Sequence, residues 1–235
     1  MTPSRGRRLL TSALDYPTPL GNVHVELEVP ARPLAVLVLG HGAGGDIDAP
    51  DLLVVRDAAL PERVAVLRVR QPYRVQGRRA PAPAGQLDQA FAALLAGIGD
   101  LPGISDRLPL LVGGRSSGAR VAARTAAGAG AAGLLALAFP LAPPGRPLVS
   151  RLDELTGAGV PSLVVQGARD PFGSAAELRT AIGDRAVGAV VEVVEVADAD
   201  HSFRTRKADP TTTAQSLAAV GAAVAPWLRA RTRSR

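Results

Sequence analysis

Residues 110–120 read Leu-Leu-Val-Gly-Gly-Arg-Ser-Ser-Gly-Ala-Arg, an apolar run that leads into Gly114-x-Ser116-x-Gly118. The apolar run predicts a buried strand, and the alanine-rich segment Ser117–Ala127 predicts a helix. A serine between them must occupy a tight, strained turn, where side chains two residues away on either side would collide. Glycine at both flanks removes that collision. The spacing therefore indicates an exposed, reactive hydroxyl on Ser116 at the end of a strand.

The rest of the chain alternates short β-branched runs with longer segments rich in alanine and leucine. In Val23–Val29 apolar and polar residues alternate, which is typical of a half-exposed antiparallel or edge strand. Further strands are expected at Leu34–Leu39, Val64–Val69, Leu108–Val112, Gly133–Phe139, Ser162–Val165 and Val190–Val196. Further helices are expected at Asp51–Leu60, Gln86–Ile98, Ala175–Ile182 and Thr213–Leu228. This order predicts the α/β class, with a mostly parallel central sheet of about seven strands and helices on both faces.

A nucleophilic serine needs a base and an acid that orients the base. His201 follows the last expected strand, and Asp170 directly follows Ser162–Val165. Both then lie at the carboxyl edge of the sheet with Ser116, in the chain order serine, acid, histidine. We therefore predict Ser116 as nucleophile, Asp170 as acid and His201 as base. Two alternatives exist for the acid. Asp170 could serve only to start a turn, because Asp-Pro is a turn signal, and Asp198 or Asp200, which lie near His201 in sequence, could be the acid instead.

A second glycine-rich turn follows the expected strand Leu34–Leu39 and reads Gly40-His-Gly-Ala-Gly-Gly45. Glycines let the backbone approach a substrate, so the N–H groups of Ala43 and Ser117 are predicted to form an oxyanion hole. His41 is interpreted chiefly as a support of this loop and, with Gly44, tentatively as a substrate contact. The third histidine, His24, is expected at the surface. No pairing of the histidines has a metal-ligand spacing, so neither a metal nor a cofactor is expected.

Five arginines come from a strand and loop that should reach the same edge: Arg68, Arg70, Arg74, Arg78 and Arg79. A guanidinium there could hold a carboxylate or phosphate of the substrate, so Arg74, Arg78 and Arg79 are tentative substrate-binding residues. The alternative is a solvated basic loop.

Together these motifs resemble the α/β-hydrolase superfamily, from about Val23 to Trp227. The chain is similar to the small dienelactone-hydrolase-like branch that includes the testis-expressed and chromatin-complex-associated hydrolase-like proteins. The residues that carry this resemblance are His41–Gly45, Gln71-Pro72-Tyr73, Gly77-Arg78-Arg79, Gly113–Arg120, Gln166-Gly167-x-Arg169-Asp170 and Asp200–Phe203. The resemblance implies the α/β-hydrolase fold, a Ser116–Asp170–His201 triad and a Ser117/Ala43 oxyanion hole.

The chain differs from dienelactone hydrolases in its nucleophile and from lipases in the length of the segment 141–161. Dienelactone hydrolases carry a cysteine nucleophile, whereas this chain has no cysteine, so their substrate is not carried over. Residues 141–161 are too few for the lid domain common in lipases. The expectation is a serine hydrolase that cleaves an ester, thioester or related acyl bond of a small molecule through an acyl-enzyme intermediate.

Composition bounds the remaining possibilities. The 235 residues are 47% hydrophobic and 20% charged, a globular composition. Seven of the 27 basic residues are arginines at the two ends, and without them 20 basic residues face 21 acidic ones. Nucleic acid is therefore not expected as a partner, because basic tails without aromatic residues are more typical of solvated ends. The uncharged stretch 125–145 is interpreted as a helix end, a loop and a buried strand, so no membrane partner is expected and the cytoplasm is the expected location.

The expected organisation is a flexible segment at residues 1–20, one α/β-hydrolase domain at 21–229 and a basic tail at 230–235. Two other functions stay open. The chain could be a catalytically weak scaffold that acts as a binding protein, since fold does not fix function. It could also be a dinucleotide-dependent oxidoreductase, because Gly40-x-Gly42-x-x-Gly45 matches that fingerprint. Against the second, Asp46–Pro50 separates the glycines from the next helix and no acidic residue ends the next strand.

Overall fold

The computed structural model describes residues 9–146, 149–183 and 190–232. Within these residues eight strands form one sheet in the order β1-β2-β4-β3-β5-β6-β7-β8. The strands are β1 (Leu10–Tyr16), β2 (Val23–Val29), β3 (Ala35–Gly40), β4 (Val64–Arg70), β5 (Leu110–Arg115), β6 (Gly133–Leu137), β7 (Ser162–Gly167) and β8 (Val191–Val196). Strands β3 to β8 are all parallel to one another, and β1 and β2 add an antiparallel edge. This is the α/β-hydrolase fold that the sequence predicted.

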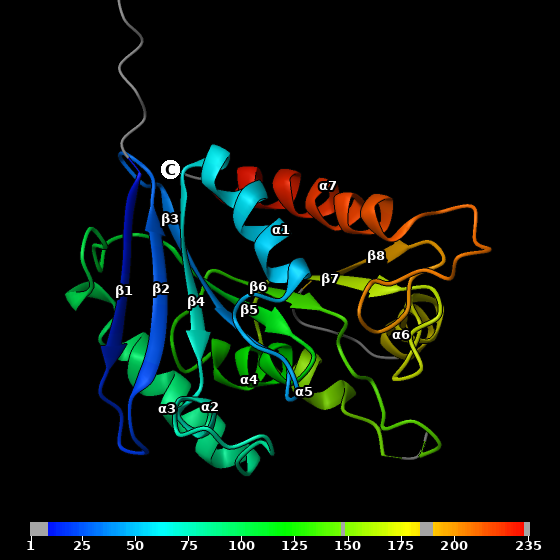
Figure 1. Ribbon diagram of the computed structural model, residues 1–235, viewed down its shortest axis with the longest axis horizontal. Coiled ribbons are helices and arrows are strands. Elements are labelled where there is room, and N and C mark those ends of the chain that lie inside the picture. The colour runs from blue at the N-terminus through cyan, green and yellow to red at the C-terminus, as the bar shows by residue number, and fades with distance from the viewer. Residues whose placement is uncertain (1–8, 147–148, 184–189, 233–235) are drawn as a thin grey trace, which may run out of the picture.

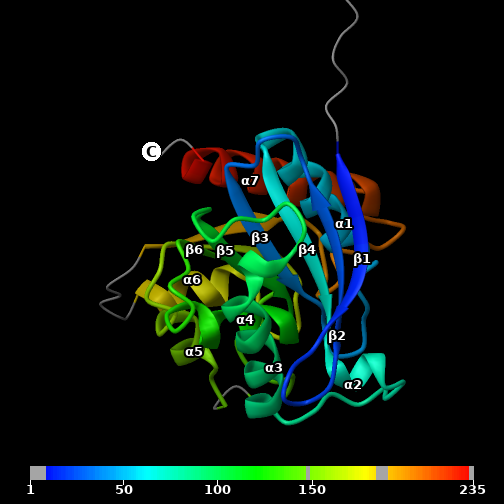
Figure 2. The same cartoon turned by 90° about the vertical axis from the view of Figure 1, so that its left-hand side faces the viewer.

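Helices cover both faces of the sheet (Figure 1). The helices are α1 (Pro50–Ala59), α2 (Pro72–Val75), α3 (Ala84–Ala96), α4 (Ser117–Ala126), α5 (Leu152–Thr156), α6 (Ala175–Gly183) and α7 (Thr213–Thr232), with 3₁₀ turns at Leu60–Glu62 and Ile98–Asp100. α1 and α7 pack on one face, and α3 and α4 lie across the sheet from them (Figure 2). Because each face has its own layer, the central strands are buried on both sides, as their continuous apolar runs require.

The N-terminal region differs from the expectation of a flexible segment at residues 1–20. Leu10–Tyr16 form strand β1, which pairs with the whole of β2 from Leu10↔Val29 to Tyr16↔Val23. This is the eighth strand, one more than expected. The run is mixed in polarity because one face of an antiparallel edge strand is solvated, so it lacks the apolar pattern of the buried strands. Residues 1–8 lie outside the described residues.

At the other end, α7 continues through residues 230–232, the start of the expected basic tail, and residues 233–235 lie outside the described residues. The uncharged stretch 125–145 contains the end of α4, a turn and strand β6, as expected. No helix in the described part of the chain is both long and apolar enough to cross a bilayer. Between β6 and β7 the described residues contain the short helix α5 and no lid domain.

The register brings four loops to one edge of the sheet. Gly40 at the end of β3 pairs with Gly114 of β5, and Gly167 at the end of β7 pairs with Val196 at the end of β8. Parallel strands all end on the same side, so the loops that follow them meet there. These loops carry the residues singled out by the sequence.

Candidate active site

Ser116 occupies a strained turn between β5 and α4. Its backbone has φ 52° and ψ −110°, a conformation that non-glycine residues rarely adopt, and its N–H donates to the Leu137 carbonyl at 2.9 Å. A Cβ on Gly114 would come within 2.4 Å of the Gly40 carbonyl oxygen, and one on Gly118 within 2.2 Å. The two flanking glycines are therefore required by close backbone packing against β3, as the spacing predicted.

Three side chains form a continuous hydrogen-bonded row at this edge. His201 Nε2 lies 2.9 Å from Ser116 Oγ, and His201 Nδ1 lies 2.8 Å from Asp170 Oδ2. The Asp170 side chain has no exposed surface, and that of His201 is 16% exposed. The three residues that were predicted from chain order thus meet within hydrogen-bonding distance, in the order of a nucleophile, a base and an orienting acid.

The acid is held by groups of its own loop. Asp170 Oδ1 accepts the N–H of Phe172, and Oδ2 accepts the side-chain amide of the fully buried Gln166. The Phe172 ring packs on His201 with centroids 4.3 Å apart. By contrast, the Asp200 carboxylate accepts N–H groups of its own turn, from Ser202 and Arg204. Of the competing acids, Asp170 is the one that faces the histidine.

The glycine-rich loop after β3 lies against Ser116. A Cβ on Gly42 would be 3.7 Å from the Cβ of Ser116, so the backbone beside Ala43 runs next to the serine. The Ala43 carbonyl accepts the Tyr73 hydroxyl at 3.0 Å, which ties the loop to α2. Ser117 is the first residue of α4, so its N–H has no partner within the helix and points toward the same end.

His41 supports this loop from inside the protein. Its side chain is buried, and its Nε2 accepts the N–H of Gln71 at 3.2 Å. Nδ1 must therefore carry the proton, which it donates to the Gly42 carbonyl at 2.7 Å. Burial lowers the pKa of His41 below its ordinary value. Both ring nitrogens are bonded to backbone groups, so the side chain has no free nitrogen for a substrate. This geometry favours the interpretation of His41 as a support of the loop over a substrate contact.

A family model described as an alpha/beta hydrolase domain matches residues 33–229. The chain belongs to this α/β-hydrolase family. No curated protein sequence was found to match. Among solved structures, a serine hydrolase homologue from Coxiella burnetii is similar with a TM-score of 0.72 at 15% identity, covering 91% of this chain and 95% of that one.

Two further solved structures resemble this α/β hydrolase. A dienelactone hydrolase from Anabaena variabilis has a TM-score of 0.70 at 18% identity, with 93% and 96% of the two chains covered. A serine hydrolase without a lid from Xanthomonas campestris has a TM-score of 0.65 at 19% identity, with 92% and 94% covered. These likenesses extend over nearly the whole chain and concern the fold.

The arginines of this α/β hydrolase divide into two groups. Arg68 is buried and pairs with Glu26 and Asp48, while Arg70 pairs with Asp46 at 2.7 Å. Arg74 lies 3.6 Å from the same Asp46. Arg68 and Arg70 are therefore engaged by internal carboxylates. The sequence could not reveal this, since the acids come from other strands and loops.

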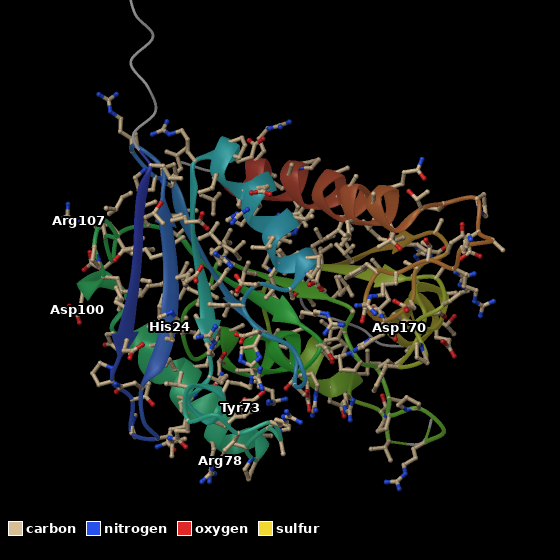
Figure 3. All side chains as sticks on the ribbon, viewed as in Figure 1. His24, Tyr73, Arg78, Asp100, Arg107 and Asp170 are labelled. Carbon is tan, nitrogen blue, oxygen red and sulfur yellow. The ribbon has the colours of Figure 1, made fainter. Side chains whose placement is uncertain are left out.

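Arg78 and Arg79 form the second group and are exposed. Arg78 lies beyond Tyr73 as seen from Asp170 (Figure 3). Neither residue is among those that line the cleft beside the triad. Their surroundings favour the solvated basic loop over a substrate clamp.

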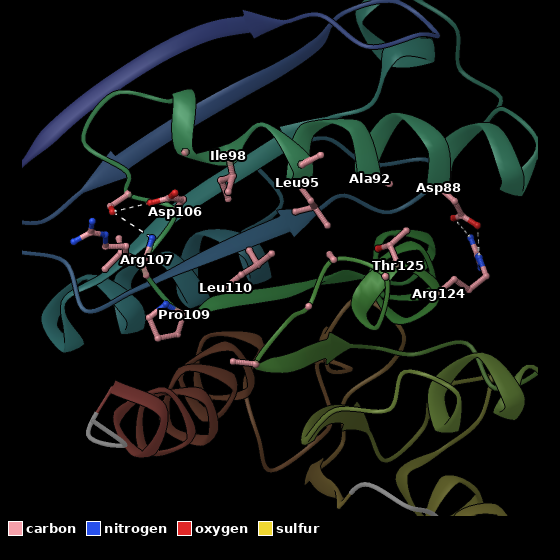
Figure 4. Close-up of a pocket in the computed structure, with 18 of the residues that line it drawn as sticks. Asp88, Ala92, Leu95, Ile98, Asp106, Arg107, Pro109, Leu110, Arg124 and Thr125 are labelled. Carbon is pink, nitrogen blue, oxygen red and sulfur yellow. Dashed lines mark hydrogen bonds and ion pairs between the residues drawn. The ribbon is translucent and has the colours of Figure 1, made fainter.

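A cleft of about 570 Å³ borders the loops that carry the triad. Gly44 lines it together with Asp51, Arg115, Ser202 and Arg204. A larger groove of about 840 Å³ lies between α3, the C-terminal half of α4 and the segment before β5 (Figure 4). That groove includes Leu110, the first residue of β5, whereas Ser116 follows the last residue. The larger hollow is thus at the opposite end of the strand from the triad.

Other chemistry finds less support in the described residues. They contain no group of three or more histidine, cysteine, aspartate or glutamate side chains arranged to hold a metal ion. Gly45 does not open into a helix, because α1 begins only at Pro50. A dinucleotide fingerprint needs the helix N-terminus directly after its glycines, so this geometry does not favour the oxidoreductase alternative.

Sequence reasoning missed the residues that support the triad. Gln166 and Phe172 stand in the stretch around Asp170, but their contacts with Asp170 and His201 depend on the folded loop. Asp51 gives no signal in sequence at all: it is the second residue of α1, 64 positions before the Arg115 side chain that it contacts. Only the three-dimensional arrangement identifies it.

Proposed function

We propose that this α/β hydrolase is a serine hydrolase that cleaves an ester, thioester or related acyl bond of a small molecule. The observation that carries the proposal is the row of Ser116, His201 and Asp170 with both intervening contacts below 3 Å. The fold of the chain and its matching family agree with it. Within the superfamily, we place the chain in the small dienelactone-hydrolase-like branch on the motifs quoted above, with serine in place of cysteine.

In the first half of the proposed reaction, Asp170 accepts the Nδ1–H of His201 and so leaves the lone pair of Nε2 facing the Ser116 hydroxyl. Nε2 takes the hydroxyl proton as Oγ attacks the carbonyl carbon of the substrate. The tetrahedral oxyanion is bound by the N–H groups of Ser117 and Ala43. His201 then gives its proton to the leaving alcohol or thiol, and an acyl-Ser116 ester remains.

In the second half, water loses a proton to His201 Nε2 and attacks the acyl carbon. The proton returns to Ser116 Oγ as the acid is released, so the enzyme is regenerated without a cofactor. The cleft of about 570 Å³ lined by Gly44 and Ser202 lies beside the loops that carry Ser116 and His201, but no residue of the triad lines it, so we do not assign it to the substrate. We assign no role in binding to Arg78 and Arg79.

The test is covalent labelling with a fluorophosphonate probe of the wild-type protein, Ser116→Ala and His201→Ala. We expect the wild type to be labelled once per chain and both variants to lose several orders of magnitude in labelling rate and in hydrolysis of 4-nitrophenyl acetate. Circular dichroism and thermal unfolding serve as controls for folding. A folded wild type that the probe leaves unmodified would contradict the proposal and favour the scaffold alternative.

A further inference from the structure

Arg115, the residue between Gly114 and Ser116, makes an unusual set of contacts for a side chain at a strand end. Its Nε lies 2.9 Å from Oδ2 of Asp51, and the side chain is 15% exposed. Its Nη2 donates to the His201 carbonyl at 3.0 Å and to Ser202 Oγ at 2.8 Å. A Cβ on Gly42 would be 2.7 Å from Nη1. One guanidinium thus touches the histidine loop, the glycine-rich loop and the start of α1.

The anchor of this guanidinium is fixed in turn. Asp51 is 2% exposed and lies in the first turn of α1, where its Oδ1 accepts the N–H of Leu52. A buried carboxylate requires a countercharge, and Arg115 is the cation at hydrogen-bonding distance from it. Arginine presents its donors in a rigid planar fork, so the ion pair at Nε and the two hydrogen bonds from Nη2 together restrain one guanidinium plane.

Arg115 contacts His201 at its backbone carbonyl and not at its imidazole. The imidazole is bound on both sides by Ser116 and Asp170. The turn around it is closed by Asp200, whose carboxylate binds the N–H groups of Ser202 and Arg204. Within the described residues, Arg115 is the one donor to the carbonyl of His201 itself.

We propose that Arg115, anchored by Asp51, is a positioning residue that fixes the backbone of His201 relative to Ser116. The inference rests on the function proposed above, in which Nε2 of His201 takes the proton of Ser116. Displacing a reacting group by about 1 Å can cost on the order of 100-fold in rate. Loss of the guanidinium should therefore lower kcat more than it changes KM, because the contacts of the fork are with Asp51, the His201 carbonyl and Ser202 Oγ.

The test compares Arg115→Met, Arg115→Lys and Asp51→Asn with the matched control Arg124→Met. Arg124 also lies on the β5–α4 unit, is 20% exposed, and loses ion pairs with Asp88 and Glu154, away from the triad. With 4-nitrophenyl acetate we expect Arg115→Met to lower kcat about 10- to 100-fold with KM within about threefold. Asp51→Asn should also lower kcat. Arg115→Lys should have a kcat between those of Arg115→Met and the wild type, because a lysine can keep one of the three contacts. Arg124→Met should lower the unfolding temperature and keep kcat.

A second readout does not depend on turnover. The ¹⁵N and ¹H resonances of the His201 ring report its hydrogen bonds to Ser116 and Asp170. In Arg115→Met these resonances should shift or broaden, and in Arg124→Met they should stay as in the wild type. A folded Arg115→Met protein with wild-type kcat and an unchanged His201 spectrum overturns the inference. If the wild type proves unreactive, the proposed function fails, and the spectra alone decide whether Arg115 positions the ring.

Discussion

The carboxylate of Asp170 distinguishes a catalytic arrangement from a chance meeting of polar residues. It is fully buried and accepts hydrogen bonds from the backbone of Phe172, from Gln166 and from the imidazole of His201. A group held from three sides fixes both the orientation and the tautomer of the ring it binds. At the residue scale, substitution of Asp170 is therefore a direct test of the proposed chemistry.

Replacing Asp170 with asparagine should leave the fold in place and reduce kcat by about 10⁴-fold. An amide can present its NH₂ group to Nδ1, which then stays unprotonated, and the proton moves to Nε2 where it blocks the base. The measurement is steady-state hydrolysis of 4-nitrophenyl acetate. The control is Asp198→Asn at the competing acid: Asp198 has φ 59°, which asparagine also tolerates, so both fold and rate should be retained. An equal loss in the two variants would argue against Asp170 as the acid.

At the scale of elements, the loop Gly40–Asp46 depends on a buried neutral imidazole. Burial lowers the pKa of His41 below about 6.5, so the folded protein resists a proton that the unfolded chain accepts. The corresponding stability is fully present above the unfolded pKa and is lost as the pH falls below it, by at most about 1.4 kcal/mol per pH unit. His41→Gln removes this titration and should be less stable than the wild type at pH 7.5.

The measurement for His41 is urea unfolding of both proteins between pH 7.5 and pH 5. The difference in their free energies of unfolding should narrow as the pH falls, because only the wild type has to keep His41 neutral. All other titrating groups are common to both chains and cancel in the difference. A difference that stays constant across this range would mean that His41 carries no stability linked to protonation.

The elements that sequence predicted well are those whose signal is local. β2 has the predicted bounds, α4 ends one residue early, and the turn at Ser116 could be placed because Gly114 and Gly118 flank it at a spacing that the sequence shows directly. Ser116, Asp170 and His201 could be proposed together because chain order and strand ends place them at one edge of the sheet. The ion pairs of Arg68 and Asp51 could not be predicted, since they depend on partners from distant elements. Short helices such as α2 and α5 also escaped prediction because they contain barely more than one turn.

At the scale of the whole molecule, the site lies at the carboxyl edge of the sheet, between the helical layers on its two faces. β3 and β5 are central in the sheet order, so the partly exposed Ser116 turn has neighbouring strands on both sides. The acid and the base come from β7 and β8, nearer one edge of the sheet. The opposite edge, formed by β1 and β2, contributes no triad residue. Its role is to close the core over α3, where Val25 and Leu27 are fully buried.

Removal of residues 1–16 tests this structural role of β1. The deletion would expose the edge of β2 and strip Leu14 and Tyr16 from the core cluster that they cover. About 1 kcal/mol corresponds to 2–4 °C in a chain of this size, and the loss of a whole paired strand should exceed that, so Tm should fall by at least about 5 °C. The deletion also uncovers the apolar residues that Leu14 and Tyr16 pack against, so the truncated protein should aggregate more readily.

The matched control is removal of residues 1–8, which leaves the β1–β2 ladder from Leu10 to Tyr16 in place. Its Tm should stay within about 2 °C of the wild type, a difference that corresponds to less than about 1 kcal/mol. Calorimetry gives Tm, and light scattering gives the aggregation. Because the triad loops lie toward the other edge of the sheet, labelling of Ser116 below the lowered Tm should persist in the longer deletion. Loss of labelling without a change in Tm would instead show that β1 acts on the site and not on the core.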